Sequence, residues 1–227
     1  MKFSSQVYSA VSGSIGGITY AHNQGGMYAR ARAVPTDPNT VQQQALRNAM
    51  GQLSTAWFAT LTQAQRDAWA VFATNVPLID SLGQSRTIPP LSWYQKANSI
   101  RLQSGLGRID AGPVIYELAT LTLPVVTLTP AGSTASMAFT NTDLWANEVG
   151  GALLVYASRP QNVTINFFKG PYRFAGRING AASPPTSPQV ITLPFVSGPA
   201  GSKQFFKVIA VRADGRPSAT FRIFDVA

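Results

Sequence analysis

The sequence contains no cysteine and only one histidine among its 227 residues. Without thiol groups, neither a disulfide framework nor a thiolate metal site is available, so the fold must depend on packing and hydrogen bonds. Long apolar runs are also missing. The longest, GALLVYA at 151–157, has the length of a strand, whereas a membrane-spanning helix needs roughly 20 apolar residues. We therefore expect a folded globular protein with no membrane partner.

A signal-peptide pattern is missing as well. Residues 1–17, MKFSSQVYSAVSGSIGG, have a single lysine, and polar residues stand where a signal peptide has its apolar block. We do not expect secretion by that route.

Acidic residues are scarce: the chain has 9 Asp and Glu against 18 Lys and Arg, a formal net charge of +9 at pH 7. This imbalance favours an acidic partner through long-range attraction. The basic excess is spread along the whole chain and forms no concentrated arm of the nucleic-acid-binding type.

Side chains suited to catalysis or metal binding are few. His22 falls in a predicted hairpin turn with no acid near it in sequence, which indicates a structural or solvent-facing residue. Asp143 and Glu148 form the nearest acidic pair, and a solvated loop explains them better than a weak calcium site. Neither a Gly-x-Ser-x-Gly elbow nor a phosphate-binding loop is present. We predict no catalytic, cofactor-binding or metal-binding residues, and hence a protein that is not an enzyme.

Glycines punctuate the first 35 residues, which otherwise contain two strand-like pieces at 18–20 and 27–34, joined by a predicted turn at HNQGG. In the second piece, Tyr28, Arg30 and Arg32 share one face, and small apolar residues share the other, because side chains alternate along a strand. Such a hairpin buries little by itself. It either packs on its own domain or acts as an arm that adds a strand to a neighbouring subunit's sheet.

The middle of the chain is predicted to be helical. Apolar residues at 41, 45, 49, 53 and 57 form a helical stripe from Val41 to about Ala59. A second helix begins with Thr62 and Gln65 in capping-box spacing. After a predicted loop at 75–90, a third helix runs from about 92 to 106.

From residue 118 the hydrophobic period changes to that of strands. Asp214-Gly215 marks the bend of the clearest strand-turn-strand pair, which resembles the last two strands of a fibronectin type III or related immunoglobulin-like domain. Seven short strands separated by Pro and Gly are typical of a β-sandwich. The strand candidates span 124–130, 134–141, 151–160, 168–178, 188–196, 203–214 and 217–226.

The predicted fold class is therefore α+β in three parts. Residues 1–38 form an extended β-hairpin arm, residues 39–117 a small helical unit, and residues 118–227 an immunoglobulin-like or fibronectin III-like β-sandwich.

The net charge of +9 makes a nucleic acid a possible class of acidic partner. The segment 168–177 interleaves aromatic residues with Lys169, Arg173 and Arg177, as single-strand binders do. The helical stretch 41–80, however, has only two basic residues against two acidic ones, which is too neutral for a recognition helix. We expect no specific nucleic-acid partner and assign these aromatic side chains to the core and edge of the sandwich.

The stretch from the glycine pair to the second helix has a distinctive pattern. It joins a glycine pair, alternating arginines, a Pro-x-x-Pro-x-Thr-x-x-Gln helix start and a Leu-Thr-x-x-Gln-Arg-x-x-Trp segment. The residues of this pattern are Gly25, Gly26, Arg30, Arg32, Pro35, Pro38, Thr40, Gln43, Arg47, Trp57, Leu61, Thr62, Gln65, Arg66 and Trp69. The pattern resembles that of a family of tailed-bacteriophage and prophage proteins, and this resemblance implies a component of a phage particle.

On this basis we expect a structural, non-enzymatic virion protein, assembled in the host cytoplasm, that decorates or cements the capsid. Its expected partners are the major capsid protein or other virion proteins, contacted by a homo-oligomer or symmetric array of copies. The arm supplies the attachment, and the predicted anchor residues are Gly25, Gly26, Tyr28, Arg30 and Arg32. No cofactor is expected.

Two alternatives stay open at the level of the sequence. The protein could belong to the tail, a tail fibre or the connector, where its sandwich would contact the host surface or another tail component. It could also be a carbohydrate-binding module in which an aromatic side chain such as Trp145, Tyr172 or Phe174 stacks on a sugar.

Overall fold

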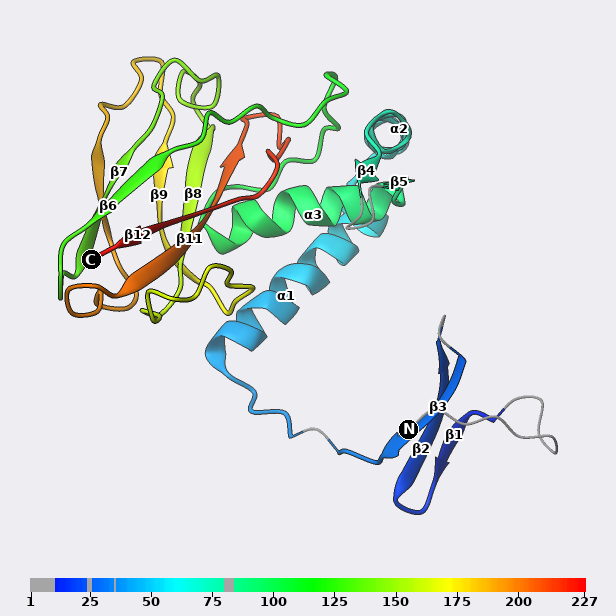
Figure 1. Ribbon diagram of the computed structural model, residues 1–227. Helices are drawn as coiled ribbons and strands as arrows, with labels where there is room; N and C mark the ends of the chain where they lie inside the picture. Colours follow the sequence, from blue (N-terminus) through cyan, green and yellow to red (C-terminus); the bar gives the residue numbers. More distant parts are fainter. Residues whose placement is uncertain (1–10, 24–25, 35, 80–83) are drawn as a thin grey trace. The chain divides into compact units, whose positions relative to one another are not determined.

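A computed structural model describes residues 11–23, 26–34, 36–79 and 84–227 of the chain. It contains three α-helices and several antiparallel sheets within these residues, and the fold is therefore of the mixed α+β kind, as the sequence predicts (Figure 1).

The chain divides into two compact units, Met1–Val41 and Gln42–Ala227, which we call unit 1 and unit 2. Unit 1 is a three-stranded antiparallel sheet in the order β1-β2-β3, and not one of its described residues is buried. The strands are β1 (Gly13–Ile15), β2 (Ile18–Asn23) and β3 (Gly26–Ala31).

Two details of unit 1 differ from the sequence prediction. A further strand, β1, precedes the expected pair, and the tight turn that joins it to β2 places Gly16 at φ +59°, a conformation that favours glycine. His22 was expected in the hairpin turn but lies in β2, directly opposite Met27. Pairing continues as far as Asn23 and Gly26, so the turn is shorter than the sequence suggests.

Unit 2 begins with the helices. The second helix has the capping box that the sequence predicts, with the Thr62 side chain accepting from the Gln65 backbone and the Gln65 side chain accepting from the Thr62 backbone. Where the sequence predicts a loop, two very short strands pair. The elements are α1 (Val41–Thr55), the π-helical turn η1 (Ala56–Thr60), α2 (Gln63–Asn75), β4 (Leu78–Ile79), β5 (Ser85–Arg86) and α3 (Pro90–Gln103).

The helices share an aromatic core. Trp69 packs edge-on against Phe72 and Tyr94, and Phe72 packs edge-on against Trp93, with ring centroids 5.2–5.9 Å apart. The predicted stripe of α1 contributes only its last part, because Leu53 is fully buried whereas Val41, at the other end, is 81% exposed.

Seven strands follow, one for each candidate found in the sequence. They form a three-stranded sheet in the order β10-β7-β6 and a four-stranded sheet in the order β12-β11-β8-β9. Both sheets contribute to one buried cluster, for example through Met137, Val155 and Phe206. The strands are β6 (Val125–Leu128), β7 (Thr134–Ala138), β8 (Ala152–Ala157), β9 (Arg173–Asn179), β10 (Gln189–Thr192), β11 (Lys203–Val211) and β12 (Phe221–Val226).

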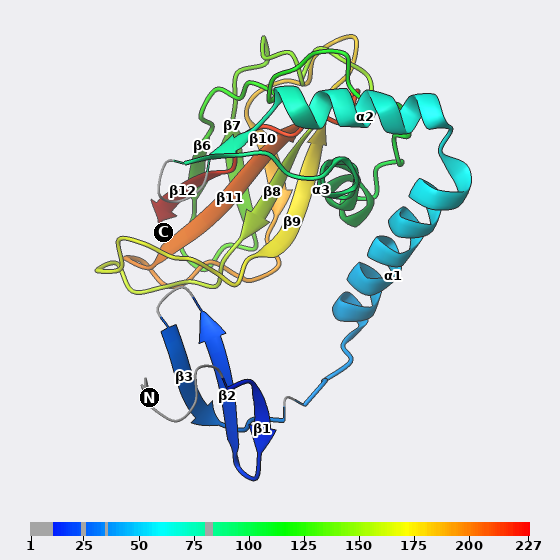
Figure 2. The ribbon, with the colours of Figure 1, turned by 90° about the vertical axis from the view of Figure 1, so that its right-hand side faces the viewer.

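The four-stranded sheet is buried on part of its other face too, because α3 lies against it (Figure 2). Leu154 and Ile209 of the sheet belong to a second buried cluster there, and Ile100 of α3 and Leu106, three residues after its end, pack on it. Every residue of β8 is therefore buried, although its side chains alternate between the two faces. The sequence alone does not show whether the helices pack on the sheets. In the structure, α3 packs on the four-stranded sheet.

Arg101 joins α3 to the sheet loops through backbone carbonyls. The residue is 5% exposed. Its Nε donates to the Gly107 carbonyl at 2.9 Å, and its Nη1 donates to the carbonyls of Gly150 at 3.3 Å and Arg212 at 3.1 Å. Burial lowers the pKa of the guanidinium, while Asp214 and Glu148 act in the opposite direction. Arg101 is thus a structural cation held by carbonyl dipoles.

Replacing Arg101 by methionine keeps much of the side-chain volume but removes all of these donors. We expect Arg101→Met to lower the free energy of unfolding by about 2–3 kcal/mol, because acceptors at the junction lose their partners. Urea denaturation measures the change. The matched control Arg86→Met, at an exposed position in β5, should stay within about 0.5 kcal/mol of the wild type. Equal stability of the two variants would contradict the assigned role of Arg101.

Candidate interaction surface

The strand register of unit 1 separates its side chains onto two faces of different character. Ile15 is directly opposite Ile18, and Ile18 is opposite Ala31, so these three side chains share one face of the sheet. Every second residue along each strand lies on this same face. Ile15 is 74% exposed and Ile18 is 43% exposed. We call this the apolar face; it consists of Ile15, Ile18, Tyr20, Met27, Ala29 and Ala31, with His22 at its end.

The opposite face is polar and basic. Arg30 lies opposite Thr19, and Tyr28 lies opposite Ala21. The hydroxyls of Ser14 and Thr19 are 2.8 Å apart and hydrogen-bonded. Arg30 is exposed, so its guanidinium is accessible to an acidic partner.

The five predicted anchor residues are only partly brought together. Tyr28 and Arg30 share the basic face of β3, as the sequence predicts. Arg32 follows the end of β3, and its backbone N–H donates to the Gly17 carbonyl at 2.8 Å. Gly26 begins β3 opposite Asn23, while Gly25 lies outside the described residues.

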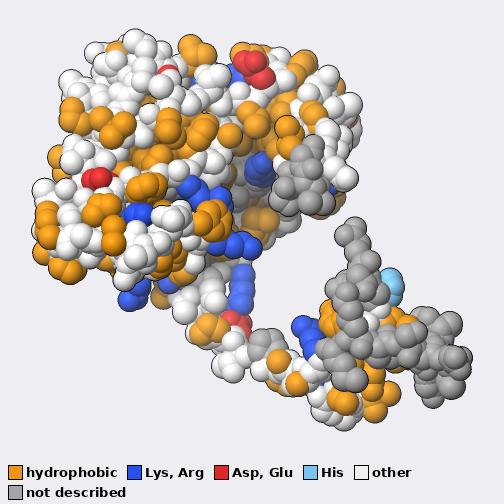
Figure 3. Space-filling model, in the orientation of Figure 1, with side chains coloured by type: hydrophobic (Ala, Val, Ile, Leu, Met, Phe, Trp, Pro, Cys, Tyr) orange, Lys and Arg blue, Asp and Glu red, His pale blue; other side chains and the backbone are white. Residues whose placement is uncertain are grey.

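The described part of unit 1 contains no buried residue. A small sheet is stable when a hydrophobic face is covered. Its apolar side chains are visible at the surface in Figure 3. Within the described residues β3 pairs on one side only, with β2, so its other edge can accept a further strand.

Asp143 and Glu148, the nearest acidic pair in the sequence, have two separate structural roles. Asp143 accepts hydrogen bonds from the Thr122 backbone at 2.9 Å and from its hydroxyl at 2.7 Å. Glu148 accepts from both Arg212 and the Ala213 backbone, and this hydrogen-bonded contact raises the pKa of the Arg212 guanidinium. Within the described part of the chain, no group of three or more His, Asp or Glu side chains is placed to hold a metal ion.

The candidate sugar-stacking residues differ in accessibility. Trp145 is fully buried, packs against Phe139 with ring centroids 5.3 Å apart, and donates its indole N–H to Asp143 at 3.3 Å. Its proposed role as a sugar platform is therefore wrong, because core packing occupies the ring. Tyr172 is half-buried and donates its hydroxyl to the Phe168 carbonyl at 2.8 Å. Phe174 is 37% exposed.

The basic residues of the segment 168–177 do not form one track. Arg177 donates to the Ser104 carbonyl at 2.6 Å and so helps to hold the end of α3. Arg173 pairs with Ala157, whose side chain belongs to the core between the sheets, so the two lie on the core side of the four-stranded sheet. A different group of side chains, which lie opposite one another on the outer face of this sheet, was not predicted from the sequence. The absence of any acid from 149 to 213 was the available signal.

Comparison with known proteins finds few similarities. No family model and no curated protein matches the chain. A solved structure, a family 76 glycoside hydrolase from a bovine Bacteroides thetaiotaomicron strain, is similar with a TM-score of 0.34 and 11% identity, over 48% of this chain and 20% of the hydrolase chain. Similarity at this level establishes neither a shared fold nor a shared activity. In the described residues, no helix has the length and apolar character to cross a membrane.

The distribution of buried residues predicts that unit 2 folds without unit 1. All three buried clusters, and all four tryptophans, lie within 42–227. We expect a polypeptide of residues 42–227 to unfold in urea with a free energy within about 0.5 kcal/mol of that of the full chain, as monitored by tryptophan fluorescence. A fragment that is unfolded or much less stable would mean that unit 1 contributes to the core of unit 2.

Proposed function

We propose that the protein is a structural, non-enzymatic component of a tailed-phage virion, and that it decorates the capsid. The resemblance of residues 25–69 to phage and prophage proteins supplies the biological setting. The observation that supports an attachment role most directly is the apolar face of unit 1, a regular sheet surface on which no described residue is buried.

The energetics favour burial of this face by another molecule. Covering a fully exposed isoleucine contributes about 1.5–3 kcal/mol; Ile15 is 74% exposed and Ile18 is 43% exposed, so each would contribute part of this. Strand addition at the free edge of β3 would add main-chain hydrogen bonds. A protein present in many copies on a symmetric shell does not need strong single contacts, since linked copies raise the overall affinity.

The positive charge of the protein also favours attachment to a shell. Arg30 and Arg32 are both exposed, and the whole chain has a net charge of +9. An acidic shell surface would attract such a protein and increase its rate of encounter, with a strong dependence on ionic strength. The apolar face then supplies affinity and the basic face supplies orientation.

Unit 2 would be the module that projects from the shell. We propose that its two sheets form an immunoglobulin-like sandwich of the fibronectin III kind. Two observations support this. Strands β6, β7 and β10 make one sheet and strands β8, β9, β11 and β12 make the other, and both sheets line one core. A sandwich of this kind is a common spacer, and the fold alone does not define what it binds.

Particle binding tests the attachment role. Removing residues 1–35 should abolish binding to particles that lack the protein, while unit 2 stays folded. The double change Ile15→Ser and Ile18→Ser should weaken binding at least tenfold, because about 1.4 kcal/mol of lost burial corresponds to a factor of ten. A matched control is Val114→Ser with Val149→Ser, two exposed positions of unit 2. Full occupancy of particles by the truncated protein would refute the proposal.

The number of copies on each particle tests the location. Quantitative mass spectrometry of purified particles should find hundreds of copies for a capsid decoration protein. A handful of copies would instead assign the protein to the tail or connector, which is the alternative.

A further inference from the structure

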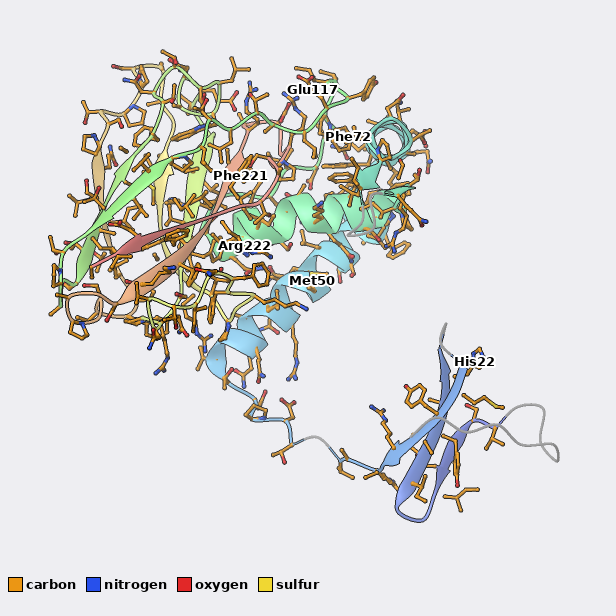
Figure 4. All side chains as sticks on the ribbon, viewed as in Figure 1. His22, Met50, Phe72, Glu117, Phe221 and Arg222 are labelled. Carbon is orange, nitrogen blue, oxygen red and sulfur yellow. The ribbon has the colours of Figure 1, made fainter. Side chains whose placement is uncertain are left out.

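A single row of side chains crosses the outer face of the four-stranded sheet. Phe174 of β9 lies opposite Tyr156 of β8, Tyr156 lies opposite Lys207 of β11, and Lys207 lies opposite Arg222 of β12. We call these four residues the cross-strand row. It follows the strand order β9-β8-β11-β12, and its members alternate with residues of the core between the sheets, so they point the other way. Arg222 is labelled in Figure 4.

The row lies between two parts of the sheet that the chain itself covers. On one side, α3 packs over Leu154 and Ile209. On the other side, Phe168 stacks on Phe205 with ring centroids 5.7 Å apart. The row itself is open at both ends, because Phe174 is 37% exposed and Arg222 is exposed. Figure 3 shows Lys and Arg side chains beside hydrophobic ones on the side of unit 2 that faces the viewer there.

The two cations of the row are placed against each other. Lys207 and Arg222 are direct cross-strand neighbours on one face, an arrangement that is unfavourable for like charges. Burial, and secondarily the charge of Arg222, lower the pKa of Lys207. Their neighbours are aromatic rings: the Lys207 ammonium is 4.4 Å from the centroid of Tyr156, and the Arg222 guanidinium is 5.6 Å from that of Phe167.

No carboxylate compensates this pair among the described residues of unit 2. Of the nine acids of the chain, Asp37 belongs to unit 1 and Asp80 is outside the described residues. The other seven contact different partners. These contacts are Asp67 with Gln63, Asp110 with Arg108, Glu117 with Arg216, Asp143 with Thr122, Glu148 with Arg212, Asp214 with Arg216 and Asp225 with the Leu128 backbone.

We propose that the cross-strand row is a binding site for a sugar that bears a phosphate or carboxylate group. The anion lies between Lys207 and Arg222, where it relieves their repulsion and accepts charge-assisted hydrogen bonds. The sugar ring extends along the row and places its apolar face against Phe174. Two strand spacings, about 10 Å, separate Lys207 from Phe174, which suits one sugar ring with its charged substituent. The inference does not depend on the virion assignment.

A nucleic-acid strand fits this surface less well. Binding of a single strand uses a series of cations along the backbone and several open rings on which bases stack. Among the described cations of this face, Lys207 and Arg222 are direct cross-strand neighbours, whereas Lys203 donates to the Ile165 carbonyl and Arg177 to the Ser104 carbonyl at the end of α3. Tyr156 is 9% exposed, so its ring offers no platform for a base.

Titration of the full-length protein tests the site, with binding followed by amide chemical shifts. The probes are glucose 6-phosphate, glucuronic acid, inorganic phosphate, uncharged glucose and a thymidine oligonucleotide. We expect both sugar acids to shift signals of β8, β11 and β12, inorganic phosphate to bind more weakly, and glucose to cause no shift. No shift with either sugar acid, or equal binding of glucose, would overturn the proposal. Tighter binding of the oligonucleotide would overturn it in favour of a nucleic-acid surface.

Substitutions locate the binding on the row. Lys207→Gln and Arg222→Gln should each weaken glucose 6-phosphate binding about tenfold, the effect of one charge-assisted hydrogen bond. Phe174→Ala should weaken glucose 6-phosphate binding but leave inorganic phosphate binding unchanged. The control Arg86→Gln removes the same charge at an exposed position of β5 and should have no effect. Unchanged affinity in the Lys207→Gln, Arg222→Gln double variant would disprove the site.

The charge pair also makes a prediction without any ligand. Arg222→Gln removes one of the two causes that lower the pKa of Lys207, so this pKa should rise toward the ordinary lysine value while burial keeps it below. Lysine side-chain NMR titration measures the change. The variant loses a like-charge contact and also the contact of Arg222 with the Phe167 ring. Thermal unfolding of the variant is therefore measured beside binding, so that a loss of ligand binding in a folded variant is not ascribed to unfolding.

Discussion

The unequal distribution of buried apolar surface is the constraint on which the rest of this structure depends. Unit 2 contains every buried cluster, whereas unit 1 has a regular sheet without a buried residue among those described. Folding has to offset a large loss of conformational entropy, mainly through apolar burial. Unit 2 meets this requirement within its own chain. Unit 1 has its apolar side chains on one face, but none of its described residues is buried, which is why we propose that a partner covers this face.

Within unit 2, α3 makes one body out of two kinds of structure. Its buried Trp93 and Tyr94 belong to the helical core, while Ile100 and Arg101, at its other end, contact the sheet and its loops. A helix with contacts on several sides shows a weak amphipathic pattern in sequence. The polar residues Asn98 and Arg101 are buried because each finds backbone partners there.

The outer face of the four-stranded sheet combines charge and aromatic surface in a way that the fold does not require. The part under α3 is apolar and sealed, and its residues serve packing. The cross-strand row places two cations directly opposite one another on neighbouring strands, which is unfavourable for like charges. A stability cost retained at one place on a surface is typical of a functional site, and the scarcity of acids in this half of the chain preserves it.

Local patterns were enough to predict most elements from the sequence. Three predictions depend only on residues near one another in sequence, and the structure contains all three. They are the Thr62 capping box, the seven strand candidates and the shared face of Tyr28 and Arg30. Only the tertiary structure determined the burial of Trp145, the packing of α3 against the four-stranded sheet and the cross-strand row, whose residues lie between 156 and 222 in the sequence. Each depends on register and packing between distant segments, and no local pattern encodes which distant residues become neighbours.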